Sequence, residues 1–246
     1  MTAVSNPPPP TSLKPIVLAM TGASGAVYAV RLLQQLLLAE RSVHLVYSPS
    51  AATVLWQELK LKLADNASTD GSEANALRSA PGDAIRHLAP LLEYCWPGSG
   101  SRWGARPELI DVVRSGRLVV HHYQDYMTPI ASGSFLTSGM VICPCSGATL
   151  SGVVHAAGNN LIQRAADVHL KEHRKLILVP RETPLSVFQL ENMHRAAQAG
   201  AIVLPAMPGW YHGVESIVDL IDFVVARILD HLDVPHRLMH RWGADS

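Results

Sequence analysis

Short apolar runs alternate with longer amphipathic stretches along most of the chain. The apolar runs predict buried strands at residues 16–20, 43–47, 117–122, 140–146, 175–180 and 201–205. The stretches between them repeat apolar residues at helical spacing and predict helices at residues 24–40, 51–63, 149–157, 161–173, 186–199 and 215–232. Because strands that alternate with helices pair in parallel, the pattern predicts an α/β fold whose parallel sheet is covered on both faces.

Two regions break this alternation. Residues 1–14, which include a run of prolines, predict a disordered and partly polyproline tail. Residues 65–107 are polar and rich in turn residues at both ends, with one possible helix at 84–94 between them. We interpret this region as an insertion into a single domain that spans residues 15–246, and not as a second domain.

The composition narrows the class of protein. Hydrophobic residues make up 48% of the 246 residues, enough for a substantial core, and Lys plus Arg equals Asp plus Glu at 20 each. This balance argues against non-specific binding to nucleic acid. No apolar run reaches the roughly 18 residues of a membrane span, and the N-terminus lacks the apolar core of a secretory signal. The small number of cysteines, three, favours a reducing, cytoplasmic location.

The turn that follows the first predicted strand reads TGASG, from Thr21 to Gly25. Small residues at a strand-to-helix turn leave backbone N–H groups at a helix N-terminus, which suits a phosphate or a cofactor. The alternative is that Ser24 is an ordinary helix cap. The glycine spacing is not that of a dinucleotide site, and Ala26 stands where a hydrolase nucleophile turn requires glycine.

A second strand-to-helix turn, PCSGATL, offers the hydroxyls of Ser146 and Thr149 to the same ligand region. Ligands of open α/β sheets bind beyond the carboxyl ends of the strands, so two such turns fit a mononucleotide that bridges adjacent strand ends. Cys143 and Cys145 are better explained as buried structural residues than as zinc ligands, because no second Cys or His pair lies nearby in the sequence. We therefore expect no metal.

The predicted helix at 161–173 carries Arg164 and Lys171 about two turns apart, so both side chains share a face and can hold a phosphate. The alternative is a solvated face on which Asp167 pairs with Lys171. His169 and His173 also share a face but have no third metal ligand, and we expect them to be surface residues.

Charged and aromatic residues follow the last two predicted strands. In PRETP, Arg181 can neutralise a phosphate or a flavin edge, and Glu182 can move protons at a desolvated strand end; the alternative is a mutual ion pair. In AMPGWYHG, Tyr211 and its neighbours can form a wall for a flat or isoprenoid-like ligand, or pack in the core. Arg227 lies in an otherwise apolar stretch of the last helix and needs a phosphate or an acidic partner.

A family resemblance extends from about residue 16 to residue 242, apart from the insertion. It rests on TGASGAVYAVRLL, SGSF, MVICPCS, NNLIQRAADVHLKE, LVPRETPLS, AGAIVLPAMPGWYH and DLIDFVVARILD, which closely resemble the UbiX-type flavin prenyltransferases. The resemblance implies a Rossmann-like, three-layer α/β/α flavoprotein fold and homo-oligomers, commonly dodecamers, that share active sites between subunits. It also implies an enzyme that joins a dimethylallyl group from dimethylallyl phosphate to N5 of reduced FMN and then closes a ring at C6. FMN would be a substrate, and the prenylated FMN would serve a UbiD-type decarboxylase.

The resemblance also implies roles for individual residues. It places FMN at Gly22, Ala23, Ser24, Ser48, Ser146, Gly147, Ala148, Thr149 and Arg181. It places dimethylallyl phosphate at Arg164, Lys171, Tyr211 and Arg227. Ser24, Glu182 and Lys171 would be catalytic, with Glu182 and Ser24 as the route for a proton that leaves carbon.

Two features depart from the family pattern. Relatives often carry Trp before the ASGS segment, where Tyr126 is the nearest candidate for a wall over the prenyl group, and the insertion is longer than expected. One alternative function is an FMN-dependent cysteine decarboxylase, but this chain has PCSGATL and PAMPGWYHG where those enzymes have PASANT-like and PxMNxxM-like segments. The other, a non-catalytic FMN-binding protein, leaves the cations Arg164, Lys171 and Arg227 unexplained.

Overall fold

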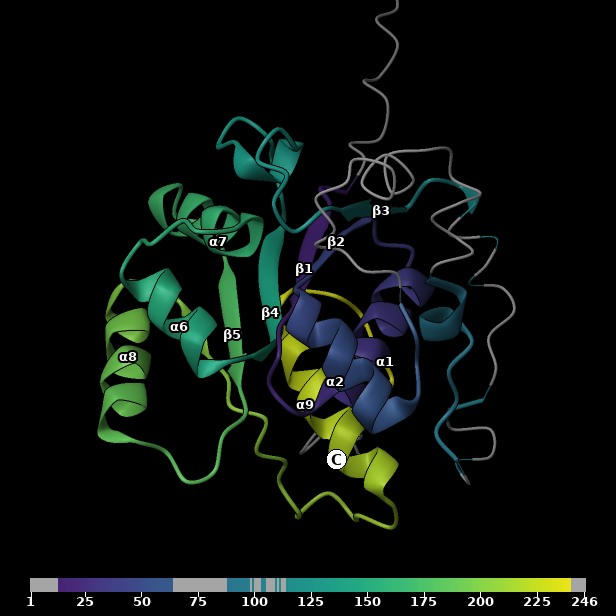
Figure 1. Cartoon of the computed structure of the whole chain (residues 1–246). Helices are drawn as coiled ribbons and strands as arrows, with labels where there is room; N and C mark the ends of the chain where they lie inside the picture. Colours follow the sequence, from purple (N-terminus) through teal and green to yellow (C-terminus); the bar gives the residue numbers. More distant parts are fainter. Residues whose placement is uncertain are drawn as a thin grey trace, which may run out of the picture.

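The computed structural model of the chain describes residues 13–63, 88–97, 99, 103–104, 109, 111 and 114–239. Residues 1–12 of the predicted tail and most of the predicted insertion at 65–107 lie outside the described residues. In the rest of the chain, strands and helices alternate as the apolar pattern predicts (Figure 1). The boundaries of the domain and of the insertion stay a prediction.

The strands of the described residues form one six-stranded sheet in which every neighbouring pair is parallel. Their order across the sheet is β3-β2-β1-β4-β5-β6, so the chain builds outward from β1 in one direction and from β4 in the other. The strands are β1 (Ile16–Met20), β2 (Val43–Tyr47), β3 (Leu118–His121), β4 (Gly139–Cys145), β5 (Leu176–Pro180) and β6 (Ile202–Val203).

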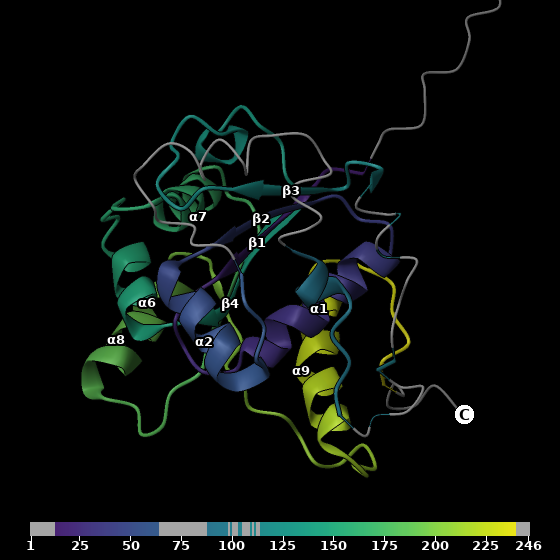
Figure 2. The same cartoon turned by 45° about the vertical axis from the view of Figure 1, so that its right-hand side comes forward.

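Helices cover both faces of this sheet (Figures 1 and 2). One layer contains α1 (Ala26–Leu38), α2 (Pro49–Leu59) and α9 (Ile217–His231), and the other contains α6 (Gly147–Val154), α7 (Leu161–Lys171) and α8 (Val187–Gln198). Successive strand side chains enter two separate apolar clusters: Leu18 packs with α1 and α9, whereas Val17 and Ala19 pack with α6 and α7. The predicted three-layer α/β/α fold is confirmed.

Several elements begin or end away from their predicted positions. α1 begins at Ala26, and not at residue 24, because Gly25 has φ 107° and cannot belong to a right-handed helix. α2 begins earlier than expected, at Pro49, which suits a first helical turn because proline has no N–H to leave unpaired. β6 keeps only Ile202 and Val203 of the predicted run 201–205, although Leu204 N and Ala206 N still donate to Leu178 O and Pro180 O of β5.

The described residues of the predicted insertion pack against α1. Leu91 and Trp103 are fully buried in the cluster that α1 and α9 form with the sheet. Gln34 of α1 joins them: its Nε2 donates to Leu91 O (2.9 Å) and Tyr94 O (3.0 Å), and its Oε1 accepts from the Trp103 indole (2.7 Å). These hydrogen bonds hold Leu91, Tyr94 and Trp103 at fixed positions along α1.

A buried ion pair lies beside Trp103. Nε and Nη2 of Arg31, on α1, donate to the two carboxylate oxygens of Asp222, on α9, at 2.7 and 3.0 Å, and both side chains are almost completely buried. The Arg31 guanidinium also lies 4.8 Å from the centre of the Trp103 ring, within the range of a cation–π contact. The pair therefore connects α1, α9 and the segment that carries Trp103.

Replacing Asp222 by Ala is expected to lower the free energy of unfolding by about 3–5 kcal/mol, because the Arg31 charge stays buried without this carboxylate. Urea denaturation at neutral pH measures the loss. The double variant Arg31→Met, Asp222→Leu replaces the pair with apolar atoms and is expected to recover most of the stability. A loss below about 1 kcal/mol in the single variant, as for exposed pairs, would contradict this account.

Candidate functional site

The candidate site lies where β1 and β4 run side by side. The chain leaves these strands toward opposite edges of the sheet, and open α/β sheets bind ligands at such a switch point, beyond the carboxyl ends. The Thr21 hydroxyl bridges the two strand ends: it donates to Pro144 O (2.7 Å) and accepts from Ser146 N (2.8 Å). Thr21 is only 2% exposed, so the bridge is shielded from water and fixes the spacing of the two turns.

The turn after β1 packs closely against the start of α2. A Cβ on Gly22 would lie 2.5 Å from Ser50 Oγ and 2.6 Å from Ser50 Cβ, so the position requires glycine. Gly25, in a left-handed conformation, is the residue that caps α1. The interpretation of Ser24 as the helix cap is therefore wrong, and the Ser24 side chain is exposed in the turn.

A carboxylate from α2 already occupies the N-terminus of α1. Glu58 accepts from the backbone N–H of Gly25 (3.0 Å) and of Ala26 (2.9 Å). A negative charge is favourable at this end of a helix. The sequence suggests that these N–H groups are free, and that expectation is wrong because a residue more than thirty positions away satisfies both. No local motif marks Glu58, whose position depends on the packing of α2 against α1.

Two serines cap the neighbouring helices. Ser48 Oγ accepts from Ala51 N (3.1 Å) at the start of α2 and lies 2.9 Å from Ser50 Oγ. Ser146 Oγ accepts from Thr149 N (3.3 Å) at the start of α6 and donates to Thr149 Oγ1 (3.0 Å). Since Thr149 Oγ1 is the acceptor in this contact, its own proton remains available to a ligand.

Arg181 joins the end of β5 to the turn after β1. Its Nε donates to Ser24 O at 3.1 Å. Glu182 does not pair with it: the carboxylate is exposed, accepts from Thr183 N (3.2 Å) and lies 3.5 Å from Gln189 Nε2. The mutual ion pair and the desolvated surroundings that the sequence suggests for Glu182 are therefore both wrong.

These contacts gather the residues that the sequence assigns to FMN at one edge of the sheet. The group consists of Gly22, Ala23, Ser24, Ser48, Ser146, Gly147, Ala148, Thr149 and Arg181. Three further residues that the sequence does not single out form hydrogen bonds with these turns: Thr21, Ser50 and Glu58. The sequence could have indicated Thr21, because its hydroxyl directly follows a buried strand. It gives no such indication for Ser50 and Glu58, whose roles depend on contacts between α2 and the first turn.

The two cysteines of β4 are free, buried thiols, as the sequence suggests. Burial raises the pKa of the Cys145 thiol to about 12 and raises the pKa of the Cys143 thiol as well. Burial also raises the pKa of the Tyr28 hydroxyl, and the nearby Arg181 charge opposes this shift. Within the described ranges, no three His, Cys, Asp or Glu side chains lie close enough together to hold a metal ion.

The two cations of α7 contact residues outside the strand-end turns. Arg164 pairs with Asp167 (3.1 Å), and its Nε donates to Ala131 O (3.1 Å) in the loop after β3. Lys171 pairs with Glu172, and this hydrogen bond lowers the pKa of the Glu172 carboxyl. The alternative pair of Asp167 with Lys171 is therefore wrong. Both cations remain partly exposed, as the binding of a phosphate requires.

His169, which the sequence assigns to the surface, is buried. It is 1% exposed; its Nδ1 donates to Ala165 O (2.7 Å), and its Nε2 accepts from the Thr137 hydroxyl (2.8 Å). Burial lowers the pKa of the imidazole to about 4, so the ring is neutral at neutral pH. The surface prediction is wrong for His169, which holds the loop before β4 against α7, and correct for His173.

The two tyrosines of the predicted site lie in surface loops. Tyr126 is 42% exposed, and its hydroxyl donates to Gly158 O (3.1 Å) ahead of α7. Tyr211 is 68% exposed in the loop between β6 and α9. The alternative that Tyr211 packs in the core is therefore wrong, and both rings have surface available for a ligand.

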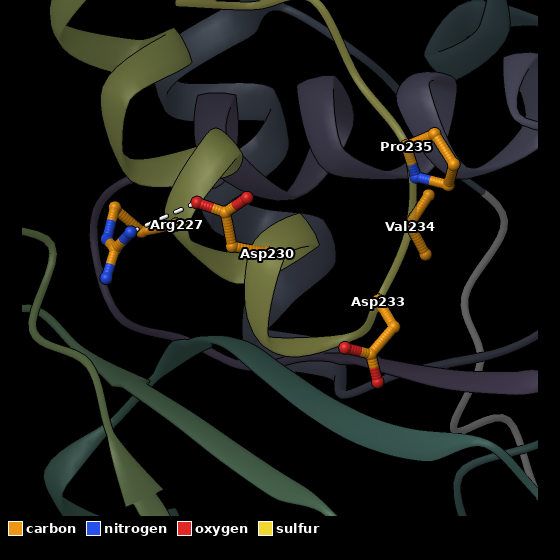
Figure 3. Close-up of a pocket in the computed structure, with 5 residues that line it drawn as sticks. All are labelled: Arg227, Asp230, Asp233, Val234 and Pro235. Carbon is orange, nitrogen blue, oxygen red and sulfur yellow. Dashed lines mark hydrogen bonds and ion pairs between the residues drawn. The ribbon is translucent and has the colours of Figure 1, made fainter. Parts of the chain in front are cut away.

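Arg227 lies on the exposed side of α9 and pairs with Asp230 at 3.0 Å. A pocket of about 470 Å³ at the end of this helix is lined by Arg227, Asp230, Asp233, Val234 and Pro235 (Figure 3). Leu232, just beyond α9, packs beside Gly139 at the start of β4, so the pocket lies toward the amino ends of the strands. The structure therefore does not bring Arg227 to the strand-end turns of its own chain.

Comparisons with known proteins place this geometry in a family. The sequence profile of the Flavoprotein family matches residues 5–229. The flavin prenyltransferase UbiX of Pseudomonas aeruginosa is 45% identical over 228 residues, which cover 93% of each chain. The chain belongs to the UbiX-type flavin prenyltransferase family. None of the described helices of this UbiX-type chain is long and apolar enough to cross a membrane.

Two solved structures share the fold of this UbiX-type chain. AnUbiX (PadA1), in complex with FMN and dimethylallyl pyrophosphate, matches with a TM-score of 0.70 and 33% identity, covering 94% of this chain and 98% of that one. A dodecameric FMN-dependent UbiX-like decarboxylase from Escherichia coli O157:H7 matches with a TM-score of 0.68 and 33% identity, covering 93% and 99%. The Rossmann-like flavoprotein fold that the sequence resemblance implies is confirmed.

The substitution Gly22→Ala is expected to disturb the first turn, because the new Cβ would lie 2.5 Å from Ser50 Oγ. We expect the free energy of unfolding to fall by about 1–3 kcal/mol, the usual cost of overpacking, measured by urea denaturation. Ser50→Gly removes the clashing atoms, so Gly22→Ala should cost little when it is added to Ser50→Gly. If Gly22→Ala lowers the free energy of unfolding equally in the wild type and in Ser50→Gly, the contact with Ser50 does not cause the loss.

Proposed function

We propose that the protein is a flavin prenyltransferase. It transfers the dimethylallyl group of dimethylallyl phosphate to N5 of reduced FMN and then closes a ring at C6, which gives prenylated FMN. The observation that carries the proposal is the group of small and hydroxyl residues around the β1–β4 switch point, joined to Arg181, in a chain of the UbiX family. FMN is a substrate in this reaction, and no metal takes part.

The flavin binds, in this proposal, against the four turns at the carboxyl ends of β1, β2, β4 and β5. Gly22 and Ala23 let the planar flavin approach the first turn, because neither presents a bulky side chain. Thr149 keeps a proton to donate, and Arg181 supplies a positive charge for the phosphate or for the reduced flavin. Ser24, Ser48 and Ser146 to Ala148 complete the proposed contacts.

Bond formation between N5 and the allylic carbon expels phosphate, so negative charge develops on the leaving group. Arg164, Lys171 and Arg227 stabilise that charge, and Tyr211 adds a hydroxyl donor. Each of these cations pairs with a carboxylate at a partly exposed position, where a phosphate can compete for it. Tyr126 provides the wall for the apolar part of the prenyl group.

Ring closure adds C6 of the flavin to the prenyl C=C bond: the π bond breaks, its more substituted carbon bonds to C6, the adjacent carbon takes up a proton, and C6 loses its own proton. Glu182 follows Arg181 at the end of β5, and Arg181 contacts the backbone of Ser24. We assign this proton transfer to a route through Glu182 and Ser24, two exposed side chains of these adjoining turns that carry oxygen.

The separation between the turns and the cations supports an assembly of several copies. The turns lie at the carboxyl ends of the strands, whereas Lys171 and Arg227 lie toward the amino ends. We therefore propose that neighbouring copies supply Lys171 and Arg227, in a dodecamer like that of the E. coli relative. We further propose that the protein works in the cytoplasm and that a UbiD-type decarboxylase consumes its product.

Anaerobic incubation of the protein with reduced FMN and dimethylallyl monophosphate should increase the flavin mass by one prenyl unit, measured by mass spectrometry. Glu182→Gln is expected to slow ring closure about 10²- to 10⁴-fold, the usual contribution of a positioned proton carrier, and to leave FMN binding unchanged. The control is Glu191→Gln, the same change at an exposed residue of α8. An unchanged flavin mass with both substrates bound to wild-type protein would contradict the proposed function.

Mixed assemblies test whether subunits share sites. Arg181→Ala and Lys171→Ala are each expected to abolish activity, because one damages the flavin turns and the other the phosphate site. If different subunits supply these residues, random co-assembly of the two variants restores about a quarter of the sites. Activity of the co-expressed mixture is the measurement, and the two separately purified variants, mixed without exchange, are the control. A co-assembled mixture as inactive as both parents would contradict the sharing of sites.

A further inference from the structure

A small aromatic cluster joins the loop after β6 to α9. Tyr211 and His212 belong to the loop, and Phe223 belongs to the helix. The His212 ring stacks on Phe223, with ring centres 5.1 Å apart and planes inclined by 23°. Tyr211 meets both rings edge-on, with its centre 6.1 Å from that of His212 and 5.8 Å from that of Phe223. Edge-on and stacked pairs at these distances are attractive, so the cluster restricts an exposed Tyr211 ring.

The backbone beside Tyr211 leaves room for this arrangement. A Cβ on Gly209 would lie 2.8 Å from the Tyr211 ring and 3.1 Å from the Phe223 ring. The Tyr211 ring therefore lies against bare backbone that a side chain would displace. Two ring contacts and one backbone contact together hold the ring at the surface.

A hydrogen bond also ties His212 to α9. Its Nε2 lies 3.2 Å from Asp219 O, and because a carbonyl oxygen can only accept, Nε2 carries the proton and Nδ1 keeps a lone pair. The Asp219 carboxylate accepts from Ser216 N (2.8 Å) and Ser216 Oγ (2.9 Å) in a capping box that closes the first turn of α9. His212 is thus attached to the capped first turn of the helix.

The second nitrogen of the ring shows that packing alone does not explain the histidine. Nδ1 is buried and has no hydrogen-bond partner among the residues that the structure describes. A buried acceptor without a partner destabilises the folded state, and phenylalanine would make the same ring contacts without that penalty. What phenylalanine lacks is the Nε2 donor, which attaches the residue next to Tyr211 to α9.

We propose that His212 is the positioning residue of Tyr211. Its hydrogen bond to Asp219 O and its stacking on Phe223 hold the Tyr211 ring and hydroxyl in place before the prenyl phosphate arrives, which lowers the entropy lost on binding. His212 acts through Tyr211 and does not contact the substrate. The inference rests on the proposed function, because it assigns Tyr211 to the prenyl phosphate.

His212→Phe keeps the ring and removes the donor. We expect the KM for dimethylallyl monophosphate to rise about 3- to 10-fold, as expected for the loss of one ordering contact, with the KM for reduced FMN unchanged. The melting temperature should stay the same or rise, because the unpaired Nδ1 is gone. Phe223→Leu keeps the donor and removes the ring contacts, and it should raise the same KM. His194→Phe, at an exposed position of α8, is the matched control and should change neither KM.

Unchanged prenyl-phosphate KM in His212→Phe would overturn the inference, and so would an equal rise in the KM values for both substrates. A wild-type protein that binds both substrates without prenylating FMN would overturn the proposed function instead. Crystal structures of the wild type and of His212→Phe test the inference independently of catalytic activity. A Tyr211 ring that is displaced or disordered only in the variant supports it, and an unmoved, ordered ring overturns it.

Discussion

The site depends on the parallel pairing of β1 with β4. These neighbours in space are separated in sequence by two strands, so the chain leaves their carboxyl ends in opposite directions and opens a crevice there. Thr21 sets the width of that crevice, because its buried hydroxyl is bonded to both strand ends at once. The starts of α1 and α6 follow from this spacing, and Arg181, at the next strand end, comes within reach of Ser24 O.

The helix N-termini that border this crevice differ in whether an acidic side chain already occupies them. Glu58 satisfies two N–H groups of α1, so an anion at that helix would have to displace a carboxylate. The first turns of α2 and α6 carry no acidic residue, and each begins with a serine cap. Because helix N-termini attract phosphate unless another anion is already there, the geometry directs a phosphate toward α2 or α6 rather than toward the TGASG turn that draws attention in the sequence.

The sequence predicts the layers of the fold better than the polar contacts of the site. Strands buried on both faces read as continuous apolar runs, which explains why β1, β2 and β5 lie where they are expected. The cap of α1 is missed because a left-handed glycine can replace a serine cap. Glu58 and the buried His169 are missed for a different reason: their partners come from other elements, and periodicity along one helix does not reveal them.

Helix direction explains why one chain leaves the proposed site incomplete. α7 starts beside Tyr123, just beyond the carboxyl end of β3, and its 11 residues carry Lys171 about 15 Å along the helix axis, toward the amino ends of the strands. α9 runs in the same direction and ends beside Gly139. Helices that follow strands in a parallel sheet must return this way, so cations on their later turns face away from the crevice of their own chain. This placement of their partly exposed ion pairs supports the proposal that a neighbouring copy completes the crevice.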